Sequence, residues 1–142
     1  MIYLLDTDVV AEITTRPKPA PAVVAWARSV PATSLYLSVI TIAEIEAGIA
    51  QTADLMRRAV FERALDGFRD DYSDRIAAIG EREALAYLSL HRKLKSAGTS
   101  IDPPDALIAA TALANGWTLV SRNIKHLART GALLLNPWEF GG

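Results

Sequence analysis

Short apolar runs alternate with amphipathic stretches along the chain. Five of the runs have the length of strands and lack polar alternation, a pattern typical of strands that are covered on both faces. These predicted strands span residues 2–5, 35–39, 75–79, 118–121 and 132–135. The stretches between them carry apolar residues at spacings of three and four, which predicts helices.

Three amphipathic stripes and one apolar segment define the principal helices. The stripes are Ile42, Ile45 and Ile49, then Phe61, Leu65, Phe68 and Tyr72, and then Ala84, Tyr87, Leu90, Leu94 and Ala97. Residues 106–114 are apolar nearly all round, which predicts a central, buried helix. The proline-rich stretch 16–21 predicts a loop between two helices, because proline is excluded from helix interiors.

Alternating strands and helices predict an α/β protein whose parallel sheet lies between helical layers. We therefore expect a three-layer α/β/α sandwich with a mainly parallel five-stranded sheet. The length of 142 residues suits a single domain over residues 1–142. Ligands of such sheets bind beyond the carboxyl ends of the strands, so polar residues at those ends are the candidates for a functional site.

Acidic side chains fall at these ends in three separate parts of the sequence. Asp6 ends the first predicted strand, Glu44 follows the second, and Asp105 lies in the first turn of the buried helix. Each position also has a structural explanation. Thr41 and Glu44 have the spacing of a capping box, and Asp102 precedes two prolines as a helix cap would. These roles do not explain why the acids should converge on one edge of the sheet.

Clustered carboxylates without histidine or cysteine suit a hard divalent cation, Mg²⁺ or Mn²⁺. Such an ion cancels the repulsion between the carboxylates, binds a phosphate oxygen and lowers the pKa of a water that attacks phosphorus. The residues therefore predict metal-assisted hydrolysis of a phosphodiester. They leave open whether one or two ions bind.

Composition excludes several other kinds of chemistry. The chain has no cysteine, which removes disulfides, thiolate metal sites and cysteine nucleophiles. No apolar stretch reaches 18 residues and the N-terminus does not resemble a signal peptide, so we expect a soluble cytoplasmic protein without a membrane anchor. The net charge of −1 does not indicate nucleic-acid binding, but a nuclease needs only a local basic rim.

Four motifs in their joint order resemble the PIN-domain family. They are LLDTDVV at the N-terminus, LSVITIAEIEAG after the second predicted strand, PPDALIAATALANG in the central helix and LVSRNIKHL near the end. The closing NPW is similar to the VapC/FitB branch, the toxins of bacterial type II toxin–antitoxin pairs. The resemblance implies a Mg²⁺-dependent endoribonuclease of the PIN fold, with an RNA substrate, a cognate antitoxin and a homodimeric state.

The same resemblance assigns roles to individual residues. It implies that the three acids named above are both the metal ligands and catalytic residues. Asn123 lies where many relatives carry a fourth acid, and we count it as a catalytic candidate because an amide oxygen can bind a metal or orient its water. Asp8 stands where relatives often have asparagine and is a secondary candidate. Thr7 and Thr41 correspond to hydroxyl positions that support the metal shell.

Basic residues follow the fourth predicted strand at the same edge. Arg122, Lys125 and His126 are therefore candidates for a substrate-binding rim, although a cationic helix face in water would have the same pattern. His91, beside Arg92 on another predicted helix, is expected to be a solvated residue. An arginine from the antitoxin could insert among the three acids and block metal and substrate together.

The helix predicted after the proline-rich loop carries more apolar residues than one stripe can bury. Val23 and Val30 share a face, whereas Val24 and Trp26 lie on other faces. We therefore expect a second chain to cover part of this region, which agrees with the homodimer that the resemblance implies.

Two other functions fit part of the sequence. Residues 6–10 match the opening D-x-D-x-[VT] motif of haloacid-dehalogenase-type phosphatases, with Asp6 as nucleophile and Ser38 ending a second strand. Against this, a loop rather than a strand precedes Asp102, and Glu44 has no role. A catalytically weak binding module on the same fold is the other alternative, because Asn123 removes one ligand charge.

Overall fold

The computed structural model describes residues 1–142 and contains one parallel sheet of five strands in the order β3-β2-β1-β4-β5. All four pairings are parallel. The strands are β1 (Tyr3–Leu5), β2 (Leu35–Ser38), β3 (Ile76–Ala77), β4 (Thr118–Val120) and β5 (Leu133–Leu135). Every predicted strand is therefore confirmed in position, each somewhat shorter than predicted.

Seven α-helices connect and cover the strands. They are α1 (Thr7–Thr14), α2 (Pro21–Ser29), α3 (Val39–Ala50), α4 (Leu55–Asp71), α5 (Glu81–Ser96), α6 (Pro103–Asn115) and α7 (Ile124–Leu127). Three short 3₁₀ turns are η1 (Ala32–Ser34), η2 (Ala128–Thr130) and η3 (Pro137–Glu139). The proline-rich segment is a loop whose last proline begins α2. None of the helices has the length and apolar character needed to span a bilayer.

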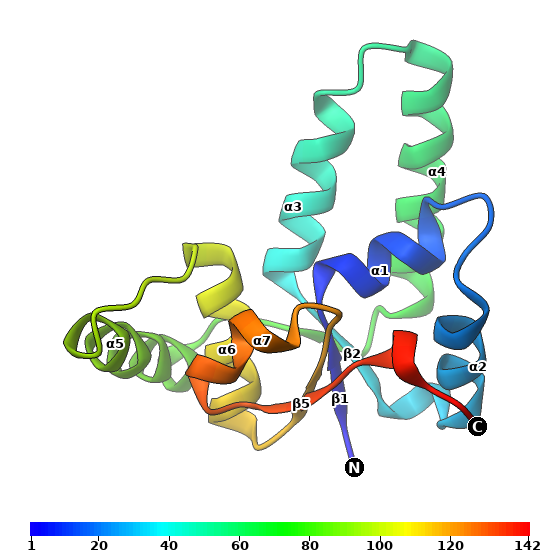
Figure 1. The fold of residues 1–142 in the computed structure, drawn as a ribbon. Helices are drawn as coiled ribbons and strands as arrows, with labels where there is room; N and C mark the ends of the chain where they lie inside the picture. Colours follow the sequence, from blue (N-terminus) through cyan, green and yellow to red (C-terminus); the bar gives the residue numbers. More distant parts are fainter.

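A hydrophobic core lies on each face of the sheet, between the strands and one layer of helices. Side chains alternate between the two faces along the central strands, so each strand contributes to both cores. Leu5 and Val120 belong to a core shared with α1 to α4, whereas Leu4 and Leu119 belong to a core shared with α5, α6 and α7. Figure 1 shows α5 and α6 on one side of the sheet and α1 and α2 on the other, with α3 and α4 projecting as a helical hairpin. The three-layer α/β/α prediction is confirmed.

The position of β1 at the centre of the sheet determines where a site can form. The chain runs from β1 to β2 on one side and returns to β4 on the other, so the strand order reverses beside β1. The starts of α1, α3 and α6 lie together just beyond this point (Figure 1). Polar residues at the ends of β1 and β4 therefore face the crevice in which ligands of open α/β sheets bind.

The predicted capping box at Thr41 and Glu44 is wrong. Helix α3 begins at Val39, three residues earlier than a cap at Thr41 would require, and its N-cap is Ser38, whose hydroxyl accepts a hydrogen bond of 3.0 Å from the amide of Ile40. Thr41 and Glu44 therefore lie inside the helix, and their side chains are directed to α1 instead of their own backbone.

Part of the excess apolar surface predicted around α2 is covered by the chain itself. Trp26 is buried within the chain, where it makes an edge-to-face contact with Tyr3 at a centroid distance of 5.3 Å. Helix α2 packs against η3, and Trp138 and Phe140 join the same core. The C-terminal segment thus covers apolar side chains of α2 that a single buried stripe would leave exposed.

Candidate active site

Asp6 is the buried acid at the centre of the site. It follows β1 directly and is the N-cap of α1, so its side chain lies at the carboxyl edge of the sheet with only 7% of its surface exposed. Its Oδ1 accepts a hydrogen bond of 2.8 Å from the amide of Thr7. Burial and then the charge of Asp8 raise the pKa of Asp6 to about 6, although its hydrogen bonds act in the opposite direction.

Ser121 is a site residue that sequence reasoning did not select. It is fully buried just after β4, and its hydroxyl donates to Oδ2 of Asp6 at 2.8 Å. Oγ of Ser121 in turn accepts a hydrogen bond of 3.0 Å from the amide of Asn123. A small polar residue immediately after a buried strand was the available signal, because such a residue needs a polar partner at the sheet edge.

Asp8, the secondary candidate, lies beside this pair. Its Oδ2 accepts a hydrogen bond of 3.0 Å from the amide of Arg122 and lies 3.3 Å from the Ser121 hydroxyl. Its Oδ1 is buried and has no hydrogen-bond partner. Burial raises the pKa of Asp8, and the amide of Arg122 opposes that shift. The unpartnered oxygen marks a place where a cation or a water is needed.

Glu44 reaches the same edge from the first half of α3. Its Oε1 accepts a hydrogen bond of 2.6 Å from the Thr7 hydroxyl, and the hydroxyls of Thr7 and Thr41 lie 3.1 Å apart. Thr41 is fully buried, which holds this chain of contacts in place. The two threonines therefore orient the glutamate, as the resemblance implied for the hydroxyl positions.

Asp105 completes the acidic cluster from the first turn of α6. Burial and then the charge of Glu44 raise its pKa, whereas His126 of α7 lowers it. These influences place Glu44 and His126 in the neighbourhood of Asp105. Asp102 is the N-cap residue of α6, but its side chain makes no capping hydrogen bond.

The remaining predicted residues lie at the rim of the cluster. Asn123 and Lys125 are exposed, and Asn123 occupies the N-cap position of α7 without a side-chain capping bond. The exposed guanidinium of Arg122 lies 5.0 Å from the centroid of the Trp138 ring, a cation–π distance. The acids, the two threonines and the segment that follows β4 thus meet at one edge of the sheet.

The acids of the cluster, Asp6, Glu44 and Asp105, form no direct ion pair with a basic side chain. No three acidic or histidine side chains stand in an arrangement that would hold one ion, and oxygens of Asp6 and Glu44 accept hydrogen bonds from Ser121 and Thr7. The ligands available at the site are carboxylates without ion-pair partners, and Oδ1 of Asp8 is buried without a hydrogen-bond partner. Such oxygen ligands fit a hard divalent cation.

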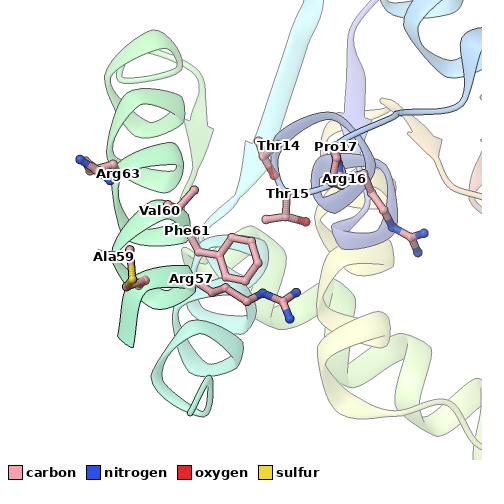
Figure 2. A pocket seen from close by; sticks show the side chains of 10 residues that line it. Thr14, Thr15, Arg16, Pro17, Arg57, Ala59, Val60, Phe61 and Arg63 are labelled. Atoms are coloured by element: carbon pink, nitrogen blue, oxygen red, sulfur yellow. The ribbon is translucent and has the colours of Figure 1, made fainter. Parts of the chain in front are cut away.

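The largest cavity lies away from the acids, between the end of α1 and the helix α4. It has a volume of about 690 Å³. Figure 2 shows Phe61 and Arg57 reaching toward the end of α1, where Thr15 and Arg16 follow the helix and line the cavity. Val60 on the same helix is 53% exposed. We name this surface the α1–α4 groove.

Comparisons with known proteins agree with the fold. The family model of the PIN domain matches residues 3–133. The plasmid stability protein StbB of Pseudomonas syringae pv. tomato is 36% identical, and VapC ribonuclease Y4jK of Sinorhizobium fredii is 33% identical. Each alignment covers 97% of this chain and 99% of the relative. The chain therefore belongs to the PIN-domain family.

Within the family, the chain is a homologue of the VapC and FitB proteins. Toxin FitB of Neisseria gonorrhoeae is 33% identical over 97% of this chain and 99% of that protein. The crystal structure of FitAcB from the same organism has a TM-score of 0.90 at 32% identity, covering 97% of this chain and 99% of that one. The resemblance read from the sequence is confirmed, and the phosphatase alternative no longer applies.

Proposed function

We propose that this chain is a Mg²⁺- or Mn²⁺-dependent endoribonuclease that acts in the cytoplasm as the toxin of a toxin–antitoxin pair. The observation that carries the proposal is the convergence of Asp6, Glu44 and Asp105 at the switch point of the sheet, where no lysine or arginine forms an ion pair with them. The names of the relatives, a VapC ribonuclease and a toxin, support the same function.

We assign two roles to the residues of the site: some would bind the cation, and others orient its ligands. Asp6, Glu44 and Asp105 would hold the cation, with Asp8 or Asn123 as an additional oxygen donor. When bound, the cation supplies positive charge to a phosphate oxygen and makes a water more acidic. Ser121 orients Asp6 and Thr7 orients Glu44, so neither carboxylate has to be ordered when the substrate arrives.

The rim supplies candidates for contacts to the RNA backbone. Arg122, Lys125 and His126 belong to the segment that follows β4, in which the amide of Arg122 donates a hydrogen bond to Asp8. The guanidinium of Arg122 lies over the ring of Trp138, and the residue remains exposed. Their positive charge would attract the phosphates of a single strand or loop toward an otherwise acidic edge.

A cleavage assay on single-stranded RNA tests the enzymatic proposal. Asp6→Asn and Asp105→Asn each remove one ligand charge and should lower the rate at least ~100-fold. Asp66→Asn, an exposed acid on α4, is the matched control and should leave the rate unchanged. Undiminished cleavage by both site variants, or cleavage in excess EDTA, would contradict the proposal. RNA binding without any cleavage in Mn²⁺ would favour the weak binding module.

The partner proposal rests on the α1–α4 groove and on the acids together. Arg16, Arg57 and the apolar side chain of Val60 suit an antitoxin segment that carries carboxylates beside apolar residues. Helix α1 has eight residues, so the groove begins about 12 Å from Asp6, a distance that about four extended residues can span. A segment seated in the groove could therefore place an arginine among the acids.

Expression in a bacterial host tests the biological role and the assembly. The wild-type chain alone should arrest growth, and Asp6→Asn should not. Co-expression of the small protein encoded beside it should restore growth. We also propose a homodimer, for which light scattering of the purified chain should give about twice the chain mass. A harmless, active monomer would remove the toxin and dimer proposals and leave the nuclease proposal intact.

A further inference from the structure

A second cavity lies close to the acidic cluster. It has a volume of about 210 Å³ and is enclosed by the second half of α5 and the start of α6. The two helices pack together and are joined by the short segment 97–102, so the end of α5 lies beside the start of α6. Pro103 and Ala106 line the cavity and flank Asp105 in sequence. This α5–α6 cavity therefore shares the start of α6 with Asp105 of the acidic cluster.

The polar groups of the α5–α6 cavity favour an anion. None of the residues that line it is acidic. Lys95 and His91 of α5 are exposed at the cavity, and Lys95 takes part in no ion pair. Ser100 adds an exposed hydroxyl, whereas the hydroxyl of Thr99 is directed to the carbonyl of Leu94 at 3.3 Å. An ammonium, an imidazole and a hydroxyl thus remain available to a ligand.

One wall of the cavity is aromatic. The rings of Tyr87 and His91 are nearly parallel, with an interplanar angle of 29° and a centroid distance of 6.3 Å. Tyr87 is half-buried against the core around Leu90 and Ala106, which limits its rotation. A fixed aromatic surface next to a flexible cation is the combination with which proteins bind single-stranded nucleic acid without reading its sequence.

We propose that the α5–α6 cavity is a second nucleotide-binding subsite for the RNA whose cleavage is proposed above. One base stacks on the aromatic wall formed by Tyr87 and His91, and the neighbouring phosphate contacts Lys95. The strand then crosses the first turn of α6 to reach Asp105. The subsite rests on the proposed nuclease function, and it adds a contact on the α5 side of the cluster, apart from the rim that follows β4.

Fluorescence anisotropy of a labelled single-stranded RNA, titrated in EDTA so that no cleavage occurs, tests the phosphate contact. Lys95→Gln should weaken binding several-fold and reduce the slope of log affinity against log salt by about 0.7, the value for one phosphate contact on a single strand. Arg92→Gln is the matched control, because Arg92 is exposed on the same helix and does not line the cavity. This control should leave both the affinity and the slope unchanged.

The stacking contact is tested with variants of His91 that either remove the ring or keep a flat ring without its charge. His91→Ala should weaken binding by about 5-fold or more, whereas His91→Phe, which keeps a flat ring, should retain most of the affinity. Both variants should fold normally, because His91 is exposed. Circular dichroism and thermal melts verify this before the titrations.

The outcomes separate the subsite from the nuclease proposal. The subsite is overturned if the wild type binds RNA, Lys95→Gln has the same affinity and salt slope as Arg92→Gln, and His91→Ala has the affinity of the wild type. The nuclease proposal then stands. If the wild type neither binds nor cleaves RNA, both are overturned. Loss of affinity in Lys95→Gln and His91→Ala, with recovery in His91→Phe, supports the subsite.

Discussion

The hydroxyl of Ser121 donates a hydrogen bond of 2.8 Å to Oδ2 of Asp6, although 115 positions separate the two residues in the sequence. The bond joins the end of β4 to the end of β1 at the place where the strand order reverses. It also lowers the pKa of Asp6, against the larger effect of burial. Ser121 therefore keeps a buried carboxylate oriented and partly stabilised as an anion.

Removing this hydroxyl should affect both stability and activity. Ser121→Ala leaves Oδ2 of Asp6 and the amide of Asn123 without their partner, so the free energy of unfolding should fall by about 1–3 kcal/mol. Cleavage should fall about 10- to 100-fold, as is typical when a group that orients a metal ligand is lost. Urea unfolding and the RNA assay measure the two effects. Ser73→Ala, in an exposed turn, is the control, and equal behaviour of the two variants would contradict the assignment.

The pKa of Asp6 should make the stability of the metal-free protein depend on pH. Because the folded-state pKa of about 6 lies above the ordinary value of 3.8, the folded chain binds the proton more tightly than the unfolded chain. The stabilisation from protonated Asp6 is fully present below about pH 4 and is lost as the pH rises through about 6. Between pH 5 and 7.5 the free energy of unfolding of the wild type should fall by on the order of 1 kcal/mol more than that of Asp6→Asn.

Urea unfolding in EDTA at the two pH values measures this difference. The Asn variant has no proton to exchange at position 6, so it reports the contribution of every other group. Added Mg²⁺ should restore stability to the wild type at pH 7.5, because a ligand of the folded state stabilises it by mass action. Identical pH dependence in the two proteins would show that Asp6 is not the group responsible.

The contact between Thr7 and Glu44 gives a conservative test of orientation. Thr7→Val keeps the shape of the side chain but removes the donor to Oε1 of Glu44, which lies 2.6 Å away. Cleavage should fall by at least about 10-fold. Thr7→Ser retains the hydroxyl and should keep most of the activity, with thermal melts confirming that both variants fold. A Val variant as active as the Ser variant would show that Glu44 needs no such support.

The α1–α4 groove should bind the antitoxin independently of catalysis. Arg57→Glu reverses a charge that lines the groove. The affinity of the chain for the antitoxin, the small protein encoded beside it, should therefore fall by about 10-fold or more. RNA cleavage by the chain alone should not change, because the groove lies beyond the far end of α1 from Asp6. Arg92→Glu on α5 is the matched charge reversal outside the groove, and calorimetric titration compares the two. Equal affinities would place the antitoxin elsewhere.

Local patterns in the sequence were sufficient for the architecture and for the principal acids. Periodicity is a property of neighbouring residues, so the strands and the main helices could be predicted before any contact was known. Asp6 and Asp105 could be selected because the carboxyl ends of parallel strands and the starts of the following helices meet at one edge. Their convergence follows from topology and does not depend on details of packing.

Contacts between distant segments were decided only by the tertiary structure. The cap of α3 is Ser38 and not Thr41, because Thr41 and Glu44 turn to Thr7, 37 positions from the glutamate. Sequence motifs describe one segment at a time, and a hydroxyl can cap its own helix or bond to another. Packing chooses between these alternatives, since each buried polar group must find a partner in the folded chain. The same requirement joins Ser121 to Asp6.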